Sequence, residues 1–228
     1  MPQFGVGRGP ARRCHARDRF RFIQMKQSLF GAVLVGGRSS RMGRPKWREQ
    51  VGGIPMAVRA AAALEPHARE IATVAPDDRP RLPGTSVLLD AMPGRGPLSA
   101  LVAVLERARQ RGDAGALVLA CDLPLVDAAL IGTLVDAWAG EDVVAPTWRG
   151  QLQPLCALWS VSALLAAREA LAAERLSVLD LVSQLRIRNL TEVEWKSPDG
   201  ASEPLINVNS PADLARVRSL LAHGRRVG

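Results

Sequence analysis

Short apolar runs alternate with longer alanine- and leucine-rich segments along most of the chain, and this alternation limits the fold more than any other feature. Runs such as Phe30–Val35 carry no charge at any position, which is typical of strands buried on both faces of a parallel sheet. Segments such as Leu98–Gln110 have the length of a helix. Strands that are each followed by a helix pair in parallel through right-handed crossovers. The sequence therefore predicts an α/β fold with a single doubly wound, mostly parallel sheet and helices on both faces.

The expected elements follow one another without a linker long enough to separate two domains, so we expect residues 25–228 to form a single domain. The clearest helix start lies at Ser210, which precedes Pro211 and is followed three residues later by Asp213, in a close relative of a capping box. The expected strands are Phe30–Val35, Ile71–Ala75, Val87–Leu89, Ala116–Ala120, Val143–Ala145, Leu152–Trp159 and Ile187–Leu190. The expected helices are Pro55–Leu64, Leu98–Gln110, Asp127–Trp138, Val161–Ala173, Val178–Gln184 and Pro211–Ala222.

The composition of the 228 residues, 47% hydrophobic and 23% charged, is that of a globular protein and excludes a disordered or collagen-like chain. A chain of this length buries roughly 70% of its unfolded surface, so it needs neither disulfides nor a structural metal. Cys14, Cys121 and Cys156 are far apart and lack C-x-x-C spacing, which excludes a zinc cluster and favours a cytoplasmic location. No apolar run reaches the roughly 18 residues that cross a membrane, so we expect no membrane partner.

The net charge of +8 is concentrated near the N-terminus. Residues 1–24 contain six arginines and one acid, Asp18, so they contribute +5 and the other 204 residues contribute +3. The basic charge therefore forms no single patch on the expected domain, and it is not interleaved with aromatic residues as in RNA-binding motifs. We expect residues 1–24 to be a disordered arginine-rich extension and nucleic acid not to be a partner. An RNA-binding or targeting arm is the alternative.

A glycine- and arginine-rich loop follows the first expected strand, at the end of the sheet where ligands bind. Residues 36–46, GGRSSRMGRPK, contain three glycines, three arginines and Lys46, one of only three lysines in the chain. Glycines let backbone N–H groups approach an anion, and the cations neutralise phosphate charge. The loop matches neither G-x-x-x-x-G-K-[ST] nor G-x-G-x-x-G. It predicts a phosphate site of another type, with a flexible surface turn as the alternative.

Five motifs, in order, give the chain a resemblance to a known family. Residues 34–46, LVGGRSSRMGRPK, resemble the signature loop of the nucleotidyltransferases that join a nucleoside monophosphate to a phosphorylated small molecule. The loop is most similar to that of the molybdenum cofactor guanylyltransferases, the MobA family. The other four motifs are Asp90 with GPLSA at 96–100, VLACDLP at 118–124, QPLCALW at 153–159 and NVNSP at 207–211. The resemblance implies a Rossmann-like nucleotidyltransferase fold.

By this resemblance, the first loop binds the nucleotide. Leu34, Val35, Gly36 and Gly37 would contact the guanine nucleotide, chiefly through the backbone. Lys46 would bind its phosphates, a role that suits a compact and strongly hydrated cation, with a solvated surface lysine as the alternative. Arg41 would steady the triphosphate or the pterin phosphate. The resemblance also assigns to the second substrate's site Gly43, Gly96, Asn207 and Asn209.

Asp122 is the predicted metal ligand. It comes shortly after the expected strand Ala116–Ala120, so its side chain should emerge at the carboxyl edge of the sheet. One carboxylate beside substrate phosphates is a typical environment for Mg²⁺. The alternative is an N-cap for the helix that begins near Asp127. Asn209, by resemblance, helps to bind the metal or the pterin, with a turn residue before the helix cap as the alternative.

Asp90, at the end of the expected strand Val87–Leu89, is implied to bind the guanine base or the ribose. A carboxylate can accept both N1–H and the exocyclic amine, a pair of donors that only guanine offers among the common bases. A surface-loop aspartate is the alternative. The family's asparagine after the second strand has no counterpart within residues 72–76, ATVAP, so Thr73 or a backbone group must serve in its place.

The predicted activity is transfer of GMP from GTP to molybdenum-loaded molybdopterin with release of pyrophosphate. Mg²⁺ is the expected cofactor, and Lys46, Arg41 and Asp122 are the expected catalytic residues. Cofactor-synthesis proteins and recipient molybdoenzymes are candidate protein partners. One alternative is a cytidylyltransferase that acts on the same pterin or on another small-molecule phosphate; Gly36 and Gly37 favour guanine by resemblance. The other is a noncatalytic cofactor carrier, against which Lys46 and Asp122 argue.

Overall fold

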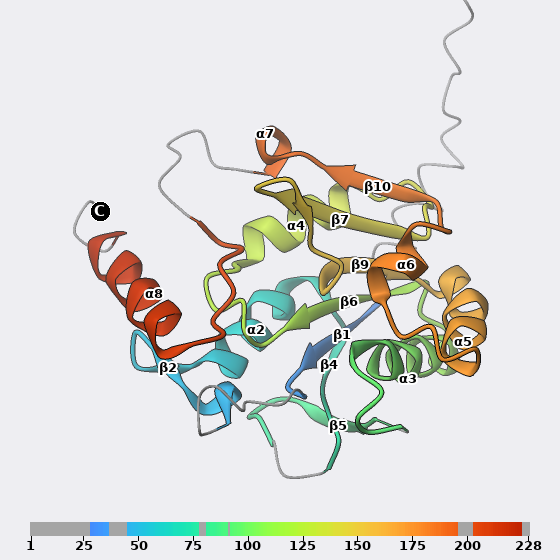
Figure 1. Ribbon diagram of the computed structural model, residues 1–228, viewed down its shortest axis with the longest axis horizontal. Helices are drawn as coiled ribbons and strands as arrows, with labels where there is room; N and C mark the ends of the chain where they lie inside the picture. The colour runs from blue at the N-terminus through green and yellow to red at the C-terminus, as the bar shows by residue number, and fades with distance from the viewer. Residues whose placement is uncertain (1–27, 37–44, 78–80, 91, 196–202, 225–228) are drawn as a thin grey trace, which may run out of the picture.

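The central feature of the computed structural model is a mixed, mostly parallel sheet with helices packed on both faces (Figure 1). The structure describes residues 28–36, 45–77, 81–90, 92–195 and 203–224. The sheet has the strand order β10-β7-β9-β6-β1-β4-β5, and β8 pairs with β7 off this path. The predicted α/β architecture with one doubly wound sheet is confirmed.

The parallel part of the sheet is built around β1 (Leu29–Leu34). This strand pairs in parallel with β4 (Glu70–Ala75) on one side and β6 (Gly115–Ala120) on the other, and β5 (Ser86–Leu89) extends the sheet beyond β4. Every residue of β1 and β6 is buried, as the uninterrupted apolar runs predict. The carboxyl ends of these four strands therefore meet at one edge.

The expected strand Leu152–Trp159 is wrong as a single element. It is divided into β8 (Gln151–Leu152) and β9 (Cys156–Ser160), with a turn between them that is closed by the bond from Cys156 N–H to the Gln153 carbonyl at 3.0 Å. The turn contains Pro154, which has no N–H to give to a ladder.

Strand β9 runs antiparallel between β6 and β7 (Val143–Trp148). A connection as short as the one from β7 to β9 allows only an antiparallel return, because a parallel crossover needs a dozen residues or more. Beyond β7, β10 (Ile187–Leu190) is parallel again. The reversed strand β9, together with β8, which is antiparallel to β7 as well, makes the sheet mixed.

Two apolar layers cover the faces of the sheet. Side chains alternate along β1, so Val33 packs in the layer that contains α2 (Met56–Leu64) and α4 (Ala128–Ala137). Leu34 packs in the opposite layer, which contains α3 (Pro97–Gln110), α5 (Leu164–Ala172) and α6 (Val178–Val182). The short turns η2 (Glu65–His67) and η3 (Val161–Ala163) precede β4 and α5.

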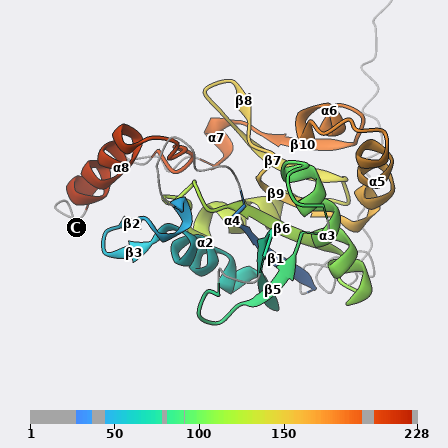
Figure 2. The ribbon, with the colours of Figure 1, turned by 60° about the horizontal axis from the view of Figure 1, so that its bottom comes forward.

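A third, smaller apolar cluster joins the C-terminal helix α8 (Pro211–Gly224) to a hairpin that the sequence did not predict. The hairpin consists of β2 (Gln50–Val51) and β3 (Ile54–Pro55) and follows the turn η1 (Lys46–Arg48). Figure 2 shows α8 beside this hairpin, away from α5 and α6. The short helix α7 (Glu192–Trp195) was not predicted either.

Some expectations concern other parts of the chain. The proposal that residues 1–24 form a disordered extension lies outside the residues that the structure describes. Within the described ranges, no helix is both long enough and apolar enough to cross a membrane.

Candidate functional site

A cleft of about 580 Å³ opens at the carboxyl ends of β1, β4, β5 and β6. Ligands of doubly wound sheets bind at this edge, because the loops that follow the strands converge there. The cleft is lined by residues of all four strand ends, of the α3 N-terminus and of the turn at Lys46. They are Leu34, Val35, Gly36, Lys46, Val74, Ala75, Pro76, Asp90, Gly94, Gly96, Pro97, Ala100, Ala120, Cys121, Asp122 and Leu155.

Asp122 is the acidic group at the centre of this edge. It lies two residues beyond β6, and its carbonyl accepts a hydrogen bond of 2.8 Å from Val208 N–H. Burial raises the pKa of the Asp122 carboxyl, while the nearby Lys46 and the backbone amide of Asp122 itself act in the opposite direction. The alternative role as a helix cap is excluded, because Asp127 caps α4 by accepting from Leu130 N–H at 2.9 Å.

Lys46 lies opposite Asp122, at the start of the turn η1. Its Nζ donates a hydrogen bond of 2.6 Å to Asn209 Oδ1 and lies 3.9 Å from Asp122 Oδ2. The side chains of Lys46 and Asp122 are 20% and 25% exposed, so the pair is partly desolvated yet open to the cleft. The structure thus brings together three predicted site residues that come from three distant motifs; Lys46 and Asn209 are 163 positions apart in the sequence.

Asp90 lies at the far side of the cleft, directly after β5. Its N–H donates to the Ala75 carbonyl at 2.9 Å, which extends the pairing of β5 with β4 by one bond. Both of its carboxylate oxygens already accept hydrogen bonds: Oδ1 from Met92 N–H at 3.0 Å and Oδ2 from Ser99 Oγ at 2.9 Å. The carboxylate therefore holds the turn ahead of α3, and any base contact must share these oxygens.

The N-terminus of α3 forms one wall of the cleft. Gly96 precedes the helix with φ of 73°, a backbone conformation that favours glycine. Pro97 then opens the helix, where a missing N–H leaves no bond unmade. Gly96 lies in the cleft lining, where a predicted substrate-binding residue should lie.

The expectation that the Thr73 side chain contacts the nucleotide needs correction. Thr73 is 0% exposed, and its hydroxyl lies 2.8 Å from the Thr85 hydroxyl, away from the cleft lining. The same strand reaches the cleft through Val74, Ala75 and Pro76 instead. The other prediction for this position, a backbone group, is the one compatible with the geometry.

The remaining predicted residues divide into three groups. Leu34, Val35 and Gly36 line the cleft as expected. Asn207 is exposed and does not line the cleft, although its neighbour Val208 is bonded to Asp122. Outside the described residues lie Gly37, Arg41 and Gly43.

Two further residues hold the site and were not predicted to do so. Ser99 is buried and links Asp90 to the α3 N-terminus through its bonds to Asp90 Oδ2 and to the Gly96 carbonyl. Arg59 of α2 donates from Nε to the Pro124 carbonyl at 2.7 Å, two residues beyond Asp122. Ser99 lies within the GPLSA motif, so the sequence offered a signal from which its role could have been predicted. Arg59 lies on an alanine-rich helix, and no sequence pattern indicated a role for it.

The cysteines next to the cleft are unsuited to nucleophilic catalysis. Cys121 lines the cleft and Cys156 is buried behind it, and both are free thiols. Burial raises the pKa of each thiol to about 12, so the reactive thiolate is scarce at neutral pH. Both cysteines are instead small buried side chains of the apolar layer that contains α2 and α4.

No group of three or more His, Cys, Asp or Glu residues that could hold a metal by themselves occurs in the described ranges. Two side-chain groups near Lys46 Nζ offer oxygens: the Asp122 carboxylate, which lines the cleft, and the Asn209 amide, which lies outside the lining. A hard divalent cation that takes few protein ligands and completes its shell with phosphates and water fits this donor set.

Comparison with known proteins gives consistent results. Residues 31–187 match the MobA-like NTP transferase domain. The chain is 33% identical to a probable molybdenum cofactor guanylyltransferase of Pelotomaculum thermopropionicum, over 87% of this chain and 95% of that protein. It is 35% identical to the molybdenum cofactor guanylyltransferase of Cereibacter sphaeroides, over 85% and 97%.

Among solved structures, the fold is similar to that of molybdopterin-guanine dinucleotide biosynthesis protein A from Archaeoglobus fulgidus. The TM-score is 0.72 at 22% sequence identity, and the match covers 86% of this chain and all of the other.

Proposed function

Because the chain belongs to the MobA-like NTP transferase family, we propose that it transfers GMP from GTP to the terminal phosphate of molybdenum-loaded molybdopterin. The products are the guanine dinucleotide form of the cofactor and pyrophosphate. The observation that carries the proposal is the cluster of Lys46, Asp122 and Asn209 at the mouth of the strand-end cleft. The names of the relatives from Pelotomaculum and Cereibacter support the choice of substrates.

The reaction forms a bond from a pterin phosphate oxygen to the α-phosphorus of GTP and breaks the bond from that phosphorus to the bridging oxygen of pyrophosphate. A phosphate oxygen is already anionic at neutral pH, so the attack needs no general base. The chain's task is therefore to align the two substrates and to neutralise the charge that develops on the leaving group. Lys46 supplies a positive charge at the cleft, and Asn209 orients it by accepting from Nζ.

The apolar strand ends and the α3 N-terminus form the nucleotide side of the cleft. Leu34, Val35, Ala75 and Pro76 leave little there except backbone groups and short apolar side chains. We infer that the guanine base lies on this side, with Asp90 near its edge. The pterin phosphate would then approach from the side of Asn209, where the C-terminal segment meets the cleft.

A divalent cation, proposed to be Mg²⁺, belongs to this site. Asp122 would hold it, because a carboxylate whose pKa is raised by burial is stabilised by an added cation. The Asn209 amide oxygen, which accepts from Lys46, would be a second candidate ligand. Bound there, the cation supplies charge neutralisation at the phosphates. Lys46 supplies a second positive charge near the same phosphates, one that belongs to the protein itself.

The proposal includes a cellular setting. The described cysteines are free and buried, in agreement with a reducing cytoplasm. The proteins that supply the pterin or receive the finished cofactor, including recipient molybdoenzymes, are the proposed protein partners.

The experiment that tests the proposal incubates the full chain with a divalent cation, molybdenum-loaded molybdopterin and each of the four nucleoside triphosphates, and follows pyrophosphate release. We expect release with GTP and dependence on the pterin. Equal release with CTP would replace the guanylyl assignment by a cytidylyl one. No release with any nucleotide, together with retained binding of the pterin, would favour a noncatalytic carrier.

A further inference from the structure

The C-terminal helix α8 begins beside the site, and its first turn is built around a single carboxylate oxygen. Asp213 Oδ2 accepts three hydrogen bonds: from Asn209 N–H at 3.0 Å, from Ser210 N–H at 2.8 Å and from the Ser210 hydroxyl at 2.8 Å. In return, Ser210 Oγ accepts from Asp213 N–H at 3.2 Å. The predicted capping box is thus present, and it reaches one residue further back than a helix cap requires, to Asn209.

Asn209 accepts the hydrogen bond that Lys46 donates. Its backbone N–H is bonded to Asp213 and its side-chain oxygen is bonded to Lys46 Nζ at 2.6 Å. Fixing the backbone of an exposed residue restricts the positions that its side chain can reach. The chain of contacts therefore runs from Asp213 through Asn209 to the cation at the cleft.

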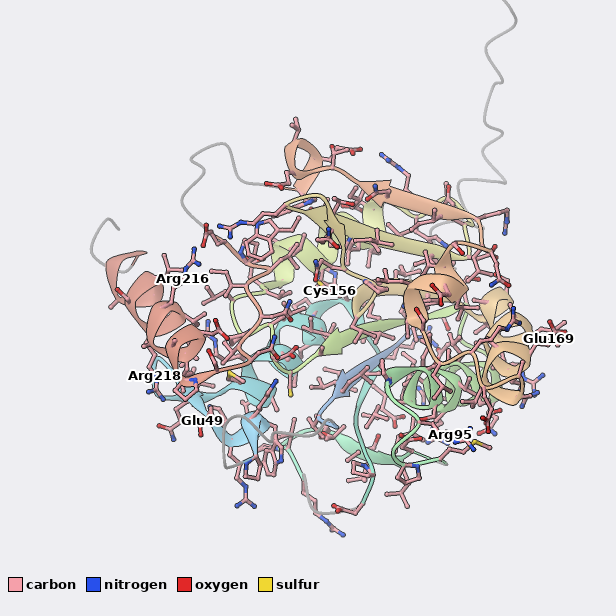
Figure 3. All side chains as sticks on the ribbon, in the orientation of Figure 1. Glu49, Arg95, Cys156, Glu169, Arg216 and Arg218 are labelled. Carbon is pink, nitrogen blue, oxygen red and sulfur yellow. The ribbon has the colours of Figure 1, made fainter. Side chains whose placement is uncertain are left out.

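The segment on either side of Asn209 is anchored as well. Val208 is fully buried against α8 and the β2–β3 hairpin, and its N–H is bonded to the Asp122 carbonyl. Helix α8 is fixed to the residues that directly follow the turn carrying Lys46: Arg218 Nε donates to the Gln50 carbonyl at 2.9 Å, and Arg218 Nη2 lies 3.7 Å from Glu49 Oε2. Figure 3 shows Arg218 and Glu49 next to each other where α8 meets the hairpin. Asn209 is thus an exposed residue between the buried Val208 and the anchored helix α8.

We propose that Asp213 is a positioning residue for nucleotidyl transfer: by holding the backbone of Asn209, it keeps the Asn209 amide oxygen against Lys46 and so fixes the direction of the Lys46 ammonium group. The proposal extends the proposed function, because it names a residue that acts on the site from the helix cap. Asp213 itself lies outside the cleft lining.

A cap elsewhere in the chain provides the matched control. Ser177 caps α6 by accepting from Asp180 N–H at 3.1 Å, and α6 lies on the opposite side of the molecule from α8 (Figure 1). Asp213→Ala removes the carboxylate half of the α8 capping box and Ser177→Ala removes the N-cap acceptor of α6, so both lower the thermal midpoint. Only Asp213→Ala should disturb Lys46.

The first measurement is a double-mutant cycle on kcat/KM for GTP. We expect Asp213→Ala to lower kcat/KM at least about tenfold, since small misplacements of a positioning contact have effects of this size. In an Asn209→Ala background the same change should add less than about twofold, because the link is already lost. Ser177→Ala should leave kcat/KM within about twofold of the native value. If Asp213→Ala prevents folding, Asp213→Asn replaces it; its uncharged amide oxygen accepts more weakly than the carboxylate, so kcat/KM should fall in the same direction by a smaller factor.

The second measurement needs no turnover and therefore separates this inference from the proposed function. The chain has three lysines, Lys26, Lys46 and Lys196, so acetylation by acetic anhydride followed by peptide mass spectrometry gives the rate at Lys46 with two internal references. Asp213→Ala should raise the rate of acetylation at Lys46 at least about twofold. Without Asp213, Asn209 is no longer held against Lys46, and its hydrogen bond no longer protects the Lys46 amine.

Two outcomes would overturn the inference. One is an unchanged Lys46 rate in Asp213→Ala, whatever the enzyme does with GTP. The other is an additive cycle, in which Asp213→Ala has the same effect with and without Asn209. If Asp213→Ala labels faster at Lys46 as expected and the native chain transfers no GMP, the proposed function is refuted, while the link from Asp213 through Asn209 to Lys46 stands.

Discussion

Asp122 and Asp90 both follow strands of the same sheet and both line the same cleft, yet their surroundings differ. Asp90 accepts hydrogen bonds on both oxygens from its own turn, through Met92 N–H and the Ser99 hydroxyl. Asp122 is buried enough to raise its pKa, and the cation near it, Lys46, lies at 3.9 Å. The Asp90 carboxylate holds the turn ahead of α3. The Asp122 carboxylate is stabilised further when a second cation binds beside it.

The comparison teaches that position at a strand end does not by itself fix a role. The same topology places both aspartates at the cleft. The hydrogen-bond donors around each carboxylate then determine how available its oxygens are to a ligand. Substitutions at the two positions should therefore differ in kind: those at Asp122 should act on catalysis, and those at Asp90 on nucleotide choice.

The largest effect is expected for Asp122→Asn. The change keeps the shape of the side chain and removes its charge, so the fold should persist while turnover falls by at least roughly a hundredfold, the scale of losing a principal charge stabiliser. Steady-state pyrophosphate release measures it, with circular dichroism as the control for folding. Near-normal turnover in a folded variant would remove Asp122 from the site.

Lys46→Ala should have the next largest effect. Loss of a charged donor weakens a contact by about 1.5–3 kcal/mol, so kcat/KM for GTP should fall roughly tenfold to a hundredfold. Lys46→Arg is the informative companion, since a planar guanidinium does not reproduce a compact ammonium between Asn209 and the phosphates. Unchanged GTP binding in Lys46→Ala would support the surface-turn interpretation of the glycine loop.

Asp90→Ala should mainly erode the preference for GTP. A bidentate contact to a base edge is worth roughly 1–3 kcal/mol of discrimination, by analogy with side chain–base pairs in nucleic acids. ITP, which lacks the exocyclic amine, is the competing substrate in this test. Ser99→Ala removes the partner of Oδ2 and keeps the carboxylate, so it separates a base contact from a turn contact. If Ser99→Ala alone abolishes the preference, Asp90 acts by holding the turn.

The smallest expected effect is on the pH dependence of stability. The raised pKa of Asp122 means that the folded chain holds this proton more tightly than the unfolded chain does. Its contribution to stability is therefore greatest at low pH and is lost as the pH rises through the folded value. The thermal midpoint of Asp122→Asn, relative to the native chain, should accordingly rise with pH across this interval.

Asp213→Asn provides a control of opposite sign. Hydrogen bonds from Ser210 and from the Asn209 backbone lower the pKa of Asp213, so its contribution is present above the ordinary aspartate value and is lost as the pH falls. Its midpoint relative to the native chain should fall as the pH rises. The same slope for both variants would contradict the assigned environments.

Sequence alone predicted the sheet and the cleft edge, because apolar runs fix the strands and topology fixes where their loops converge. The shared role of Lys46 and Asp122 was implied by the resemblance of their motifs to the family, and the structure places the two side chains 3.9 Å apart. It did not predict the break at Pro154, since the apolar pattern of Leu152–Trp159 continues through the turn. The Thr73 side chain was misplaced because Thr73 lies two residues before the end of β4, whereas the cleft is lined from this strand by Val74, Ala75 and the following Pro76. The bond from Asn209 to Lys46 depends on packing between α8 and the hairpin, which no local pattern records.

The most direct test of the central claim is the affinity of a divalent cation for the protein–nucleotide complex. Mn²⁺ is titrated into the chain with saturating α,β-methylene GTP and followed by electron paramagnetic resonance, for the native chain, Asp122→Asn and Asp90→Asn. The account predicts that Asp122→Asn weakens Mn²⁺ binding at least about tenfold and that Asp90→Asn leaves it within about twofold. Equal affinities for the native chain and Asp122→Asn, or an equal loss at both positions, would contradict it.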